Sequence, residues 1–187
     1  MKRWLGLLLR LGLPWAAGLA SVGVVGLGVV LTGAFNTTAS TPHAAPIAWV
    51  THLTMTNAVK RNATQLSNPP AFTPADVLDG ARTYDANCGV CHGGPGVARA
   101  PWVGGMTPSP PFLLDASRNW TSKELFWIVR YGVRMTGMPA WDQTLSEHDV
   151  WNLVAFLKAL PNMSAADYAR ATAAQPAPAG SGLARTP

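Results

Sequence analysis

The stretch Cys88-Gly89-Val90-Cys91-His92 decides how the rest of this sequence is interpreted. Its two cysteines are the only two in the 187-residue chain, and they stand three positions apart. A disulfide between them would close a very short loop and add little stability, because stabilisation by a cross-link grows with the length of the loop that it closes. The pair is therefore interpreted as a chemical site rather than as a structural cross-link.

The spacing Cys-x-x-Cys-His predicts the covalent attachment of haem. Two thiols three residues apart at a helix end can each form a thioether bond with one of the two vinyl groups of haem, and the next residue is then placed to bind the iron. We therefore predict one haem c, attached through Cys88 and Cys91, with His92 as an axial ligand of the iron.

Three other interpretations of the motif are weaker. A thioredoxin-like Cys-x-x-Cys requires a βαβ setting, and the sequence has no convincing strands. A zinc site requires four ligands, and only His148 is available to help the motif. A structural disulfide is conceivable only in the protein before haem is attached.

The second axial ligand of the iron is sought among five later side chains: Met106, Met135, Met138, Met163 and His148. Met138 is the best candidate because Gly137 and Pro139 flank it and form a rigid turn that can hold the thioether toward the iron. Met135 is the runner-up. The competing interpretation is that Met138 fills a gap in the core, which is the commoner role of methionine.

Helix-capping signals predict four helices in the second half of the chain, at about 73–87, 121–131, 146–160 and 164–174. The first follows Thr73-Pro74, and the others begin with capping boxes. The third is expected to stop at Pro161. A loop rich in glycine and proline, residues 93–119, separates the first two helices.

An uncharged apolar run from Leu11 to Phe35 follows the basic residues Lys2, Arg3 and Arg10. A helix of this length measures ~37 Å and can span the ~30 Å hydrocarbon core of a membrane. The basic flank predicts that the amino terminus stays in the cytoplasm and that the rest of the chain is periplasmic, anchored in the inner membrane. The alternative is a signal peptide cleaved after Ala34, although the apolar region of such peptides is usually only ~7–15 residues long.

The expected organisation is a transmembrane anchor over 1–36, a connector over 37–72, a folded domain over 73–163, and a helix with a disordered tail over 164–187. The connector is expected to contain a short surface helix over about 47–66. The net charge of the chain is +5, but residues 73–163 carry seven basic and eight acidic side chains. Because the basic excess lies outside the domain and forms no block, nucleic acid is excluded as a partner.

Residues 73–163 resemble the class I cytochrome c family. Gly80, Tyr84 and Cys88 are four apart, as in the first helix of that family, and Leu-Val-Ala-Phe-Leu-Lys at 153–158 is similar to its last helix. Arg-Met-Thr-Gly-Met-Pro-Ala-Trp at 134–141 is similar to the axial-methionine loop of short bacterial members. The resemblance implies an all-α fold around one haem, with the first and last helices crossing at the glycine.

The resemblance also implies two supporting roles. The backbone carbonyl of Pro101 is expected to support His92, and Trp141 is expected to line the haem edge near a propionate.

An apolar wall around the haem is expected from the second and third helices, formed by Leu125, Phe126, Ile128, Val129, Val150, Leu153, Val154 and Leu157. Such a wall excludes water, which together with methionine ligation raises the reduction potential.

Two axial ligands leave no open iron position. The sequence therefore predicts a single-electron carrier rather than an enzyme, exchanging electrons with redox partner proteins of a respiratory or dehydrogenase chain. The alternative is a haem enzyme or gas-binding sensor with an open iron position. A subunit fixed in a respiratory complex would share the chemistry of the carrier.

Overall fold

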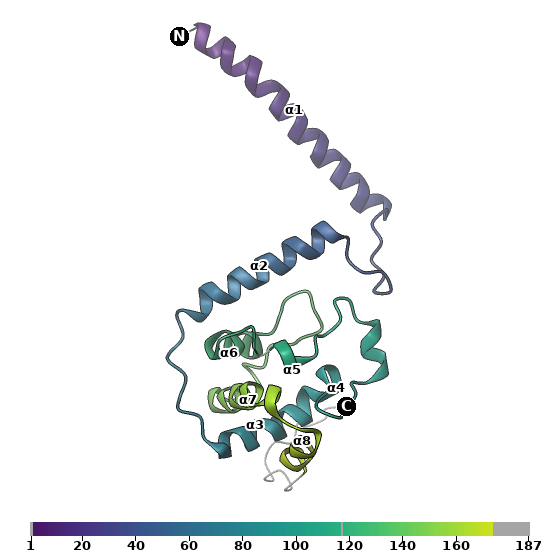
Figure 1. Cartoon of the computed structure of the whole chain (residues 1–187). Helices are drawn as coiled ribbons and strands as arrows, with labels where there is room; N and C mark the ends of the chain where they lie inside the picture. Colours follow the sequence, from purple (N-terminus) through teal and green to yellow (C-terminus); the bar gives the residue numbers. More distant parts are fainter. Residues whose placement is uncertain (1, 117, 174–187) are drawn as a thin grey trace. The chain divides into compact units, whose positions relative to one another are not determined.

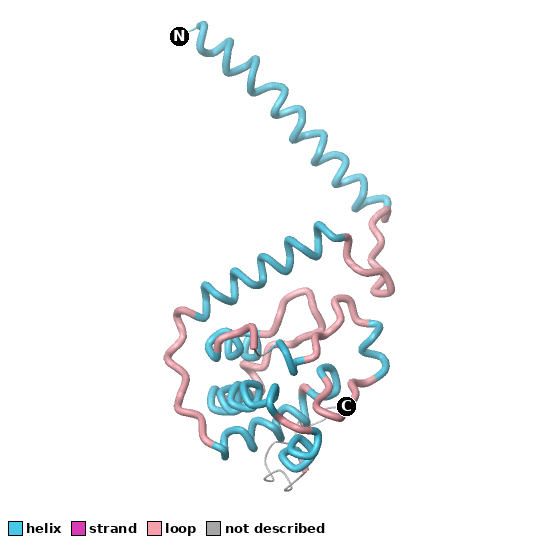
Figure 2. The backbone as a smooth tube through the Cα atoms, viewed as in Figure 1, coloured by secondary structure: helices cyan, strands magenta, loops and turns pink. Residues whose placement is uncertain are grey.

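The computed structural model describes residues 2–116 and 118–173, and every regular element among them is a helix (Figure 2). This confirms the expected all-α class. Contacts divide the chain into two compact units, of which the first is Met1–Thr38 and the second begins at Ala39.

The first unit is a single long helix, α1, Lys2–Thr32. Its portion Gly12–Thr32 has 21 residues and a mean hydropathy of 1.9, so that it is long and apolar enough to cross a membrane. Pro14 lies within the helix. Gly33, with φ +67°, follows the last helical residue, so the helix ends before the apolar run does. An anchor and a signal sequence both fit this length and composition.

The second unit contains seven α-helices and two 3₁₀ helices among the described residues (Figure 1). In chain order they are α2 Ala45–Ala63, α3 Pro74–Asn87, α4 Gly89–His92, η1 Pro101–Gly105, α5 Leu113–Ala116, α6 Ser122–Tyr131, α7 Glu147–Ala159, η2 Leu160–Asn162 and α8 Ala165–Thr172. All four predicted helices are present. Helices η1 and α5, in the segment expected to be a loop, were not predicted. The third predicted helix, α7, ends at Ala159, just before Pro161, which lies in the short helix η2 that follows.

Capping boxes begin four of these helices and explain why they start where they do. In each, a hydroxyl at the N-cap accepts a hydrogen bond from a backbone N–H three residues later, and a carboxylate at that position accepts one from the N-cap N–H. The pairs are Thr73 with Asp76, Thr121 with Glu124, Ser146 with Asp149, and Ser164 with Asp167.

Helix α7 forms the centre of the core, because eight successive residues, 150–157, are buried. A helix that is buried on all sides requires neighbours on all sides. Helix α3 crosses it so closely that a Cβ on Gly80 would lie 2.0 Å from the carbonyl oxygen of Asn152. On another face, the rings of Phe126 from α6 and Trp151 stack with centroids 4.2 Å apart. The glycine crossing agrees with the expectation from the cytochrome c resemblance.

Helix α2 packs on α6 through its carboxyl-terminal half, where Val59 and Ala63 are buried. The ammonium group of Lys123 in α6 donates a hydrogen bond to the carbonyl of Leu66, 2.9 Å away, and this bond holds the chain just after α2. Helix α2 covers Ala45–Ala63, and the sequence had indicated a surface helix over about 47–66.

Candidate haem site

The Cys-x-x-Cys-His motif consists of Cys88, which joins α3 to α4, and of the four residues of α4, Gly89–His92. Cys88 ends α3, where its N–H donates to the carbonyl of Tyr84 at 2.7 Å, and it also begins α4. The N–H of His92 donates to the carbonyl of Cys88 at 3.0 Å. Both thiols are free and half-buried. The structure therefore brings Cys88, Cys91 and His92 together on one short stretch of helix.

The environment of Cys88 argues against a thioredoxin-like motif. Burial, with a smaller contribution from Cys91, raises the pKa of the Cys88 thiol to about 12. A redox-active Cys-x-x-Cys pair requires a thiol with a lowered pKa, so that the thiolate is available near neutral pH. Cys88 is therefore a protonated thiol in an apolar setting, unlike the reactive cysteine of an oxidoreductase.

His92 is oriented by a hydrogen bond from its ring. Its Nδ1 lies 2.8 Å from the backbone carbonyl oxygen of Pro111. A carbonyl can only accept, so Nδ1 carries the proton and Nε2 keeps its lone pair for a metal. Burial lowers the pKa of His92, which also favours the neutral ring that binds metals. The expected acceptor, Pro101, was wrong: it begins η1, and the carbonyl ten residues later takes this role.

Helix α8 packs against the turn that follows the motif. This contact was not predicted, because its only signal in the sequence is an aromatic residue, Tyr168, in a capped helix. A Cβ on Gly94 would lie 2.6 Å from the ring of Tyr168, which is 1% exposed. The Tyr168 hydroxyl donates to Asp85 at 3.3 Å, and the Tyr84 hydroxyl donates to the carbonyl of Gly93 at 2.7 Å. These contacts fix the segment just after His92.

The segment 132–141 after α6 is a closed loop that carries Met135 and Met138. Its neck is fixed by Gly132, whose φ is +64° and on which a Cβ would lie 2.5 Å from the carbonyl of Pro139. The N–H of Trp141 also donates to the carbonyl of Arg130 at 2.9 Å.

The two methionines of this loop differ sharply in burial. Met138 is half-buried, and its N–H donates to the hydroxyl of Thr136 at 3.1 Å. Met135 stands at the apex with φ +62°, and 85% of it is exposed. This geometry favours Met138 over Met135 as the residue able to face a buried ligand.

The other ligand candidates lie in different settings. Met106 packs against the methionine loop, because a Cβ on Gly137 would lie 2.0 Å from the Met106 methyl carbon. Met163 packs against the core. His148 is exposed in the first turn of α7 and its ring nitrogen lies 3.2 Å from the amide of Asn152.

The residues around the motif fit a covalent haem. Seven of the eight expected wall residues are buried, Ile128 is half-buried, and Trp141 is half-buried against the same core. A buried Nη1 of Arg130 has no hydrogen-bond partner among the described residues. The carboxylates of haem would satisfy such a nitrogen. Among residues 2–116 and 118–173, no group of three or more His, Cys, Asp or Glu side chains could hold a metal ion.

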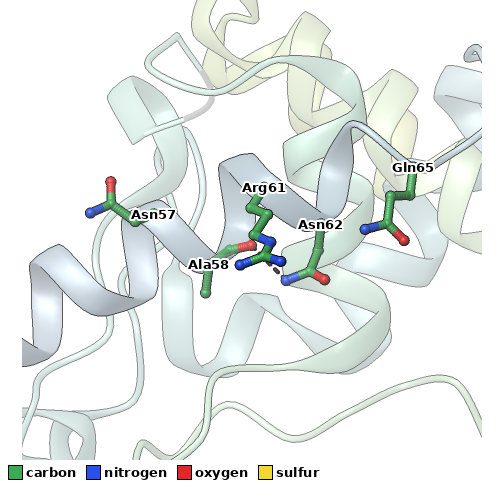
Figure 3. A pocket seen from close by; sticks show the side chains of 5 residues that line it. All are labelled: Asn57, Ala58, Arg61, Asn62 and Gln65. Atoms are coloured by element: carbon green, nitrogen blue, oxygen red, sulfur yellow. Dashed lines mark hydrogen bonds between the residues drawn. The ribbon is translucent and has the colours of Figure 1, made fainter.

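An open hollow beside α2 is a separate feature. It is lined by Asn57, Ala58, Arg61, Asn62 and Gln65, with the amide of Asn62 donating to the carbonyl of Ala58 at 2.7 Å (Figure 3). None of the expected haem-binding residues lines it. It is an indentation of the surface lined mainly by polar side chains, and it is not the expected haem site, which is identified by the motif at 88–92.

Comparison with known proteins agrees with this site. Residues 75–157 match the family model described as "Cytochrome C oxidase, cbb3-type, subunit III". The chain is also 34% identical over 100 residues to a quinohemoprotein alcohol dehydrogenase of Comamonas testosteroni. That match covers 54% of this chain and 13% of the relative. The chain thus corresponds to a small part of the relative.

The helical fold, the motif and these matches together define a class I c-type cytochrome domain. The domain binds haem c covalently and serves electron transfer. Helices α2 and α8 lie outside the region that matches the family model.

Proposed function

We propose that this protein is a single-electron carrier whose one haem is attached through Cys88 and Cys91 and ligated by His92 and Met138. The observation that carries the proposal is the placement of both thiols and of His92 on one turn, with the Nδ1 of His92 already committed to the carbonyl of Pro111. When bound, haem supplies an iron that gains and loses one electron. The residues of this chain hold the haem in place and exclude water from it.

Each residue has a distinct part in that process. The two cysteines hold the group by covalent bonds, so that it cannot dissociate. The hydrogen bond to Pro111 fixes the ring plane of His92 and raises its basicity as a ligand. The closed loop that carries Met138 presents a soft thioether. The buried side chains of α6 and α7 exclude water, and with methionine ligation this raises the reduction potential.

The proposal extends to location and partners. The apolar helix α1 would tether the domain to the outer face of the inner membrane, with its basic residues Lys2, Arg3 and Arg10 on the cytoplasmic side. Covalent haem attachment occurs on that outer side, in agreement with the motif. The name of the matched relative describes a dehydrogenase and the matched family model describes an oxidase subunit. They support electron exchange with respiratory or dehydrogenase partners.

The tether can be tested by fractionation. If the segment 12–32 is retained, the mature protein should stay in the membrane pellet after a high-salt wash, because salt weakens surface charge interactions but not apolar insertion. Its amino-terminal sequence should begin at or near Met1. A matched control replaces residues 1–36 with a cleavable signal peptide and should yield a soluble haem protein. A soluble product of the unmodified gene, beginning near Phe35, would show that the segment is a signal peptide.

The alternative function, a haem enzyme or gas-binding sensor, requires an open iron position. The half-burial of Met138 and the closed neck of its loop favour a filled position. Rapid binding of carbon monoxide by the unmodified, reduced protein would favour the alternative.

A further inference from the structure

The carbonyl that accepts the proton of His92 belongs to an unusual segment. It lies within Ser109-Pro110-Pro111-Phe112, just before α5. Neither proline has an N–H, so hydrogen bonds donated by their own backbone cannot fix their position. The acceptor for the histidine must therefore be held by contacts made from elsewhere.

Arg99 makes those contacts on both sides of Pro111. Its Nη1 donates to the carbonyl of Pro110 at 2.5 Å and reaches the Ser109 hydroxyl at 3.5 Å. The centre of its guanidinium lies 4.1 Å from the centroid of the Phe112 ring, within the range of a cation–π contact. Arg99 thus grips the residue before the acceptor and the residue after it, and it is itself half-buried.

The backbone beside Arg99 is hydrogen-bonded to the haem-attachment motif. The N–H of Ala100, next to Arg99, donates to the carbonyl of Val90 at 3.0 Å. On the other side, the Phe112 ring lies against Gly93: a Cβ there would be 3.4 Å from a carbon of the ring. The arginine is therefore connected at one end to the motif and at the other to the segment that supports the motif's histidine.

We propose that Arg99 is the positioning residue for His92: by clamping Pro110 and Phe112 it keeps the carbonyl of Pro111 on the Nδ1 proton, and so fixes the orientation and donor strength of the imidazole. The inference rests on the proposed role of His92 as an iron ligand. It goes beyond that role, because Arg99 lies seven residues after His92, outside the motif, and acts on the imidazole through Pro110 and Phe112. A lysine could keep the charge but not the planar fork and the ring contact.

The test is the exchange of the His92 Nδ1 proton with water. It is measured by nuclear magnetic resonance in the reduced, diamagnetic full-length protein, labelled with ¹⁵N-histidine and held in detergent. Arg99→Gln should speed this exchange about tenfold, the factor that corresponds to one weakened hydrogen bond. Phe112→Leu, which keeps the arginine and its charge, should speed it too, and Arg99→Lys should lie between the wild type and Arg99→Gln. Denaturing electrophoresis with haem staining should show that all variants retain haem.

Arg82→Gln is the matched control, because Arg82 is an exposed arginine on α3 paired with Asp79. It should leave the exchange unchanged. Exchange in Arg99→Gln and Phe112→Leu that equals the wild-type rate would overturn the inference. A His92 resonance without the large ring-current shift of an axial ligand would instead overturn the proposed ligation, so the two failures are distinguishable.

Discussion

Met138→Ala is expected to remove the weak near-infrared charge-transfer band of methionine-ligated oxidised haem and to lower the reduction potential. The potential should fall by a substantial part of the ~0.8 V over which axial ligands tune haem proteins, because a thioether stabilises the reduced iron. The vacated position should also let the reduced protein bind carbon monoxide. Absorption spectroscopy and potentiometric titration measure these three changes.

Met135→Ala is the control within the same loop. Met135 is 85% exposed at the apex of the loop, so its loss should leave the band and the potential as they are. Methionine and alanine both carry a Cβ, so the backbone strain at the positive φ of position 135 is the same before and after the replacement. If Met135→Ala removes the band and Met138→Ala retains it, the ligand assignment is reversed.

Gly80→Ala is expected to destabilise the fold by about 3 kcal/mol, at the upper end of the usual cost of overpacking. The added Cβ would lie 2.0 Å from the carbonyl oxygen of Asn152 and 2.9 Å from the Cβ of Phe156. Neither atom can move away by rotation of a side chain, because one is a backbone oxygen and the other is a Cβ, so α3 and α7 must separate. Guanidinium titration followed by circular dichroism measures the free energy of unfolding.

Gly104→Ala is the matched control for this prediction. A Cβ on Gly104, in η1, meets nothing within 4 Å. The substitution should therefore change the free energy of unfolding by well under 1 kcal/mol, as is usual for exposed positions. Equal stability of the Gly80 and Gly104 variants would contradict the close crossing of α3 and α7.

The helices could be predicted from the sequence because their signals are local. Each of Thr121, Ser146 and Ser164 is followed three residues later by a carboxylate, and each pair forms the expected capping box. Gly132, with its positive φ, ends α6 for an equally local reason. The covalent haem was likewise predicted from a local signal, the five-residue motif. The cytochrome class was predicted from that motif together with the spacing of Gly80, Tyr84 and Cys88 and the similarity of two further short segments.

The supports of the site could not be predicted, because they depend on residues distant in the sequence. The acceptor for His92 is 19 residues away, in a segment with several prolines, and the proline that was expected to supply it, Pro101, begins η1 instead. Tyr168 reaches Asp85 across a separation of 83 residues. No periodicity or capping signal encodes such contacts. The domain boundary at residue 73 and the ligand Met138 remain predictions.

The most direct test of the account is the mass of the denatured protein. The full chain is produced in a host that matures c-type cytochromes, denatured with acid and solvent, and measured by intact mass spectrometry. The account predicts the polypeptide plus one haem, and loss of that added mass when Cys88 and Cys91 are both changed to alanine. A denatured wild-type protein with the mass of the polypeptide alone, its haem released into the solvent, would contradict the central claim that this is a c-type cytochrome with its haem bound through these two cysteines.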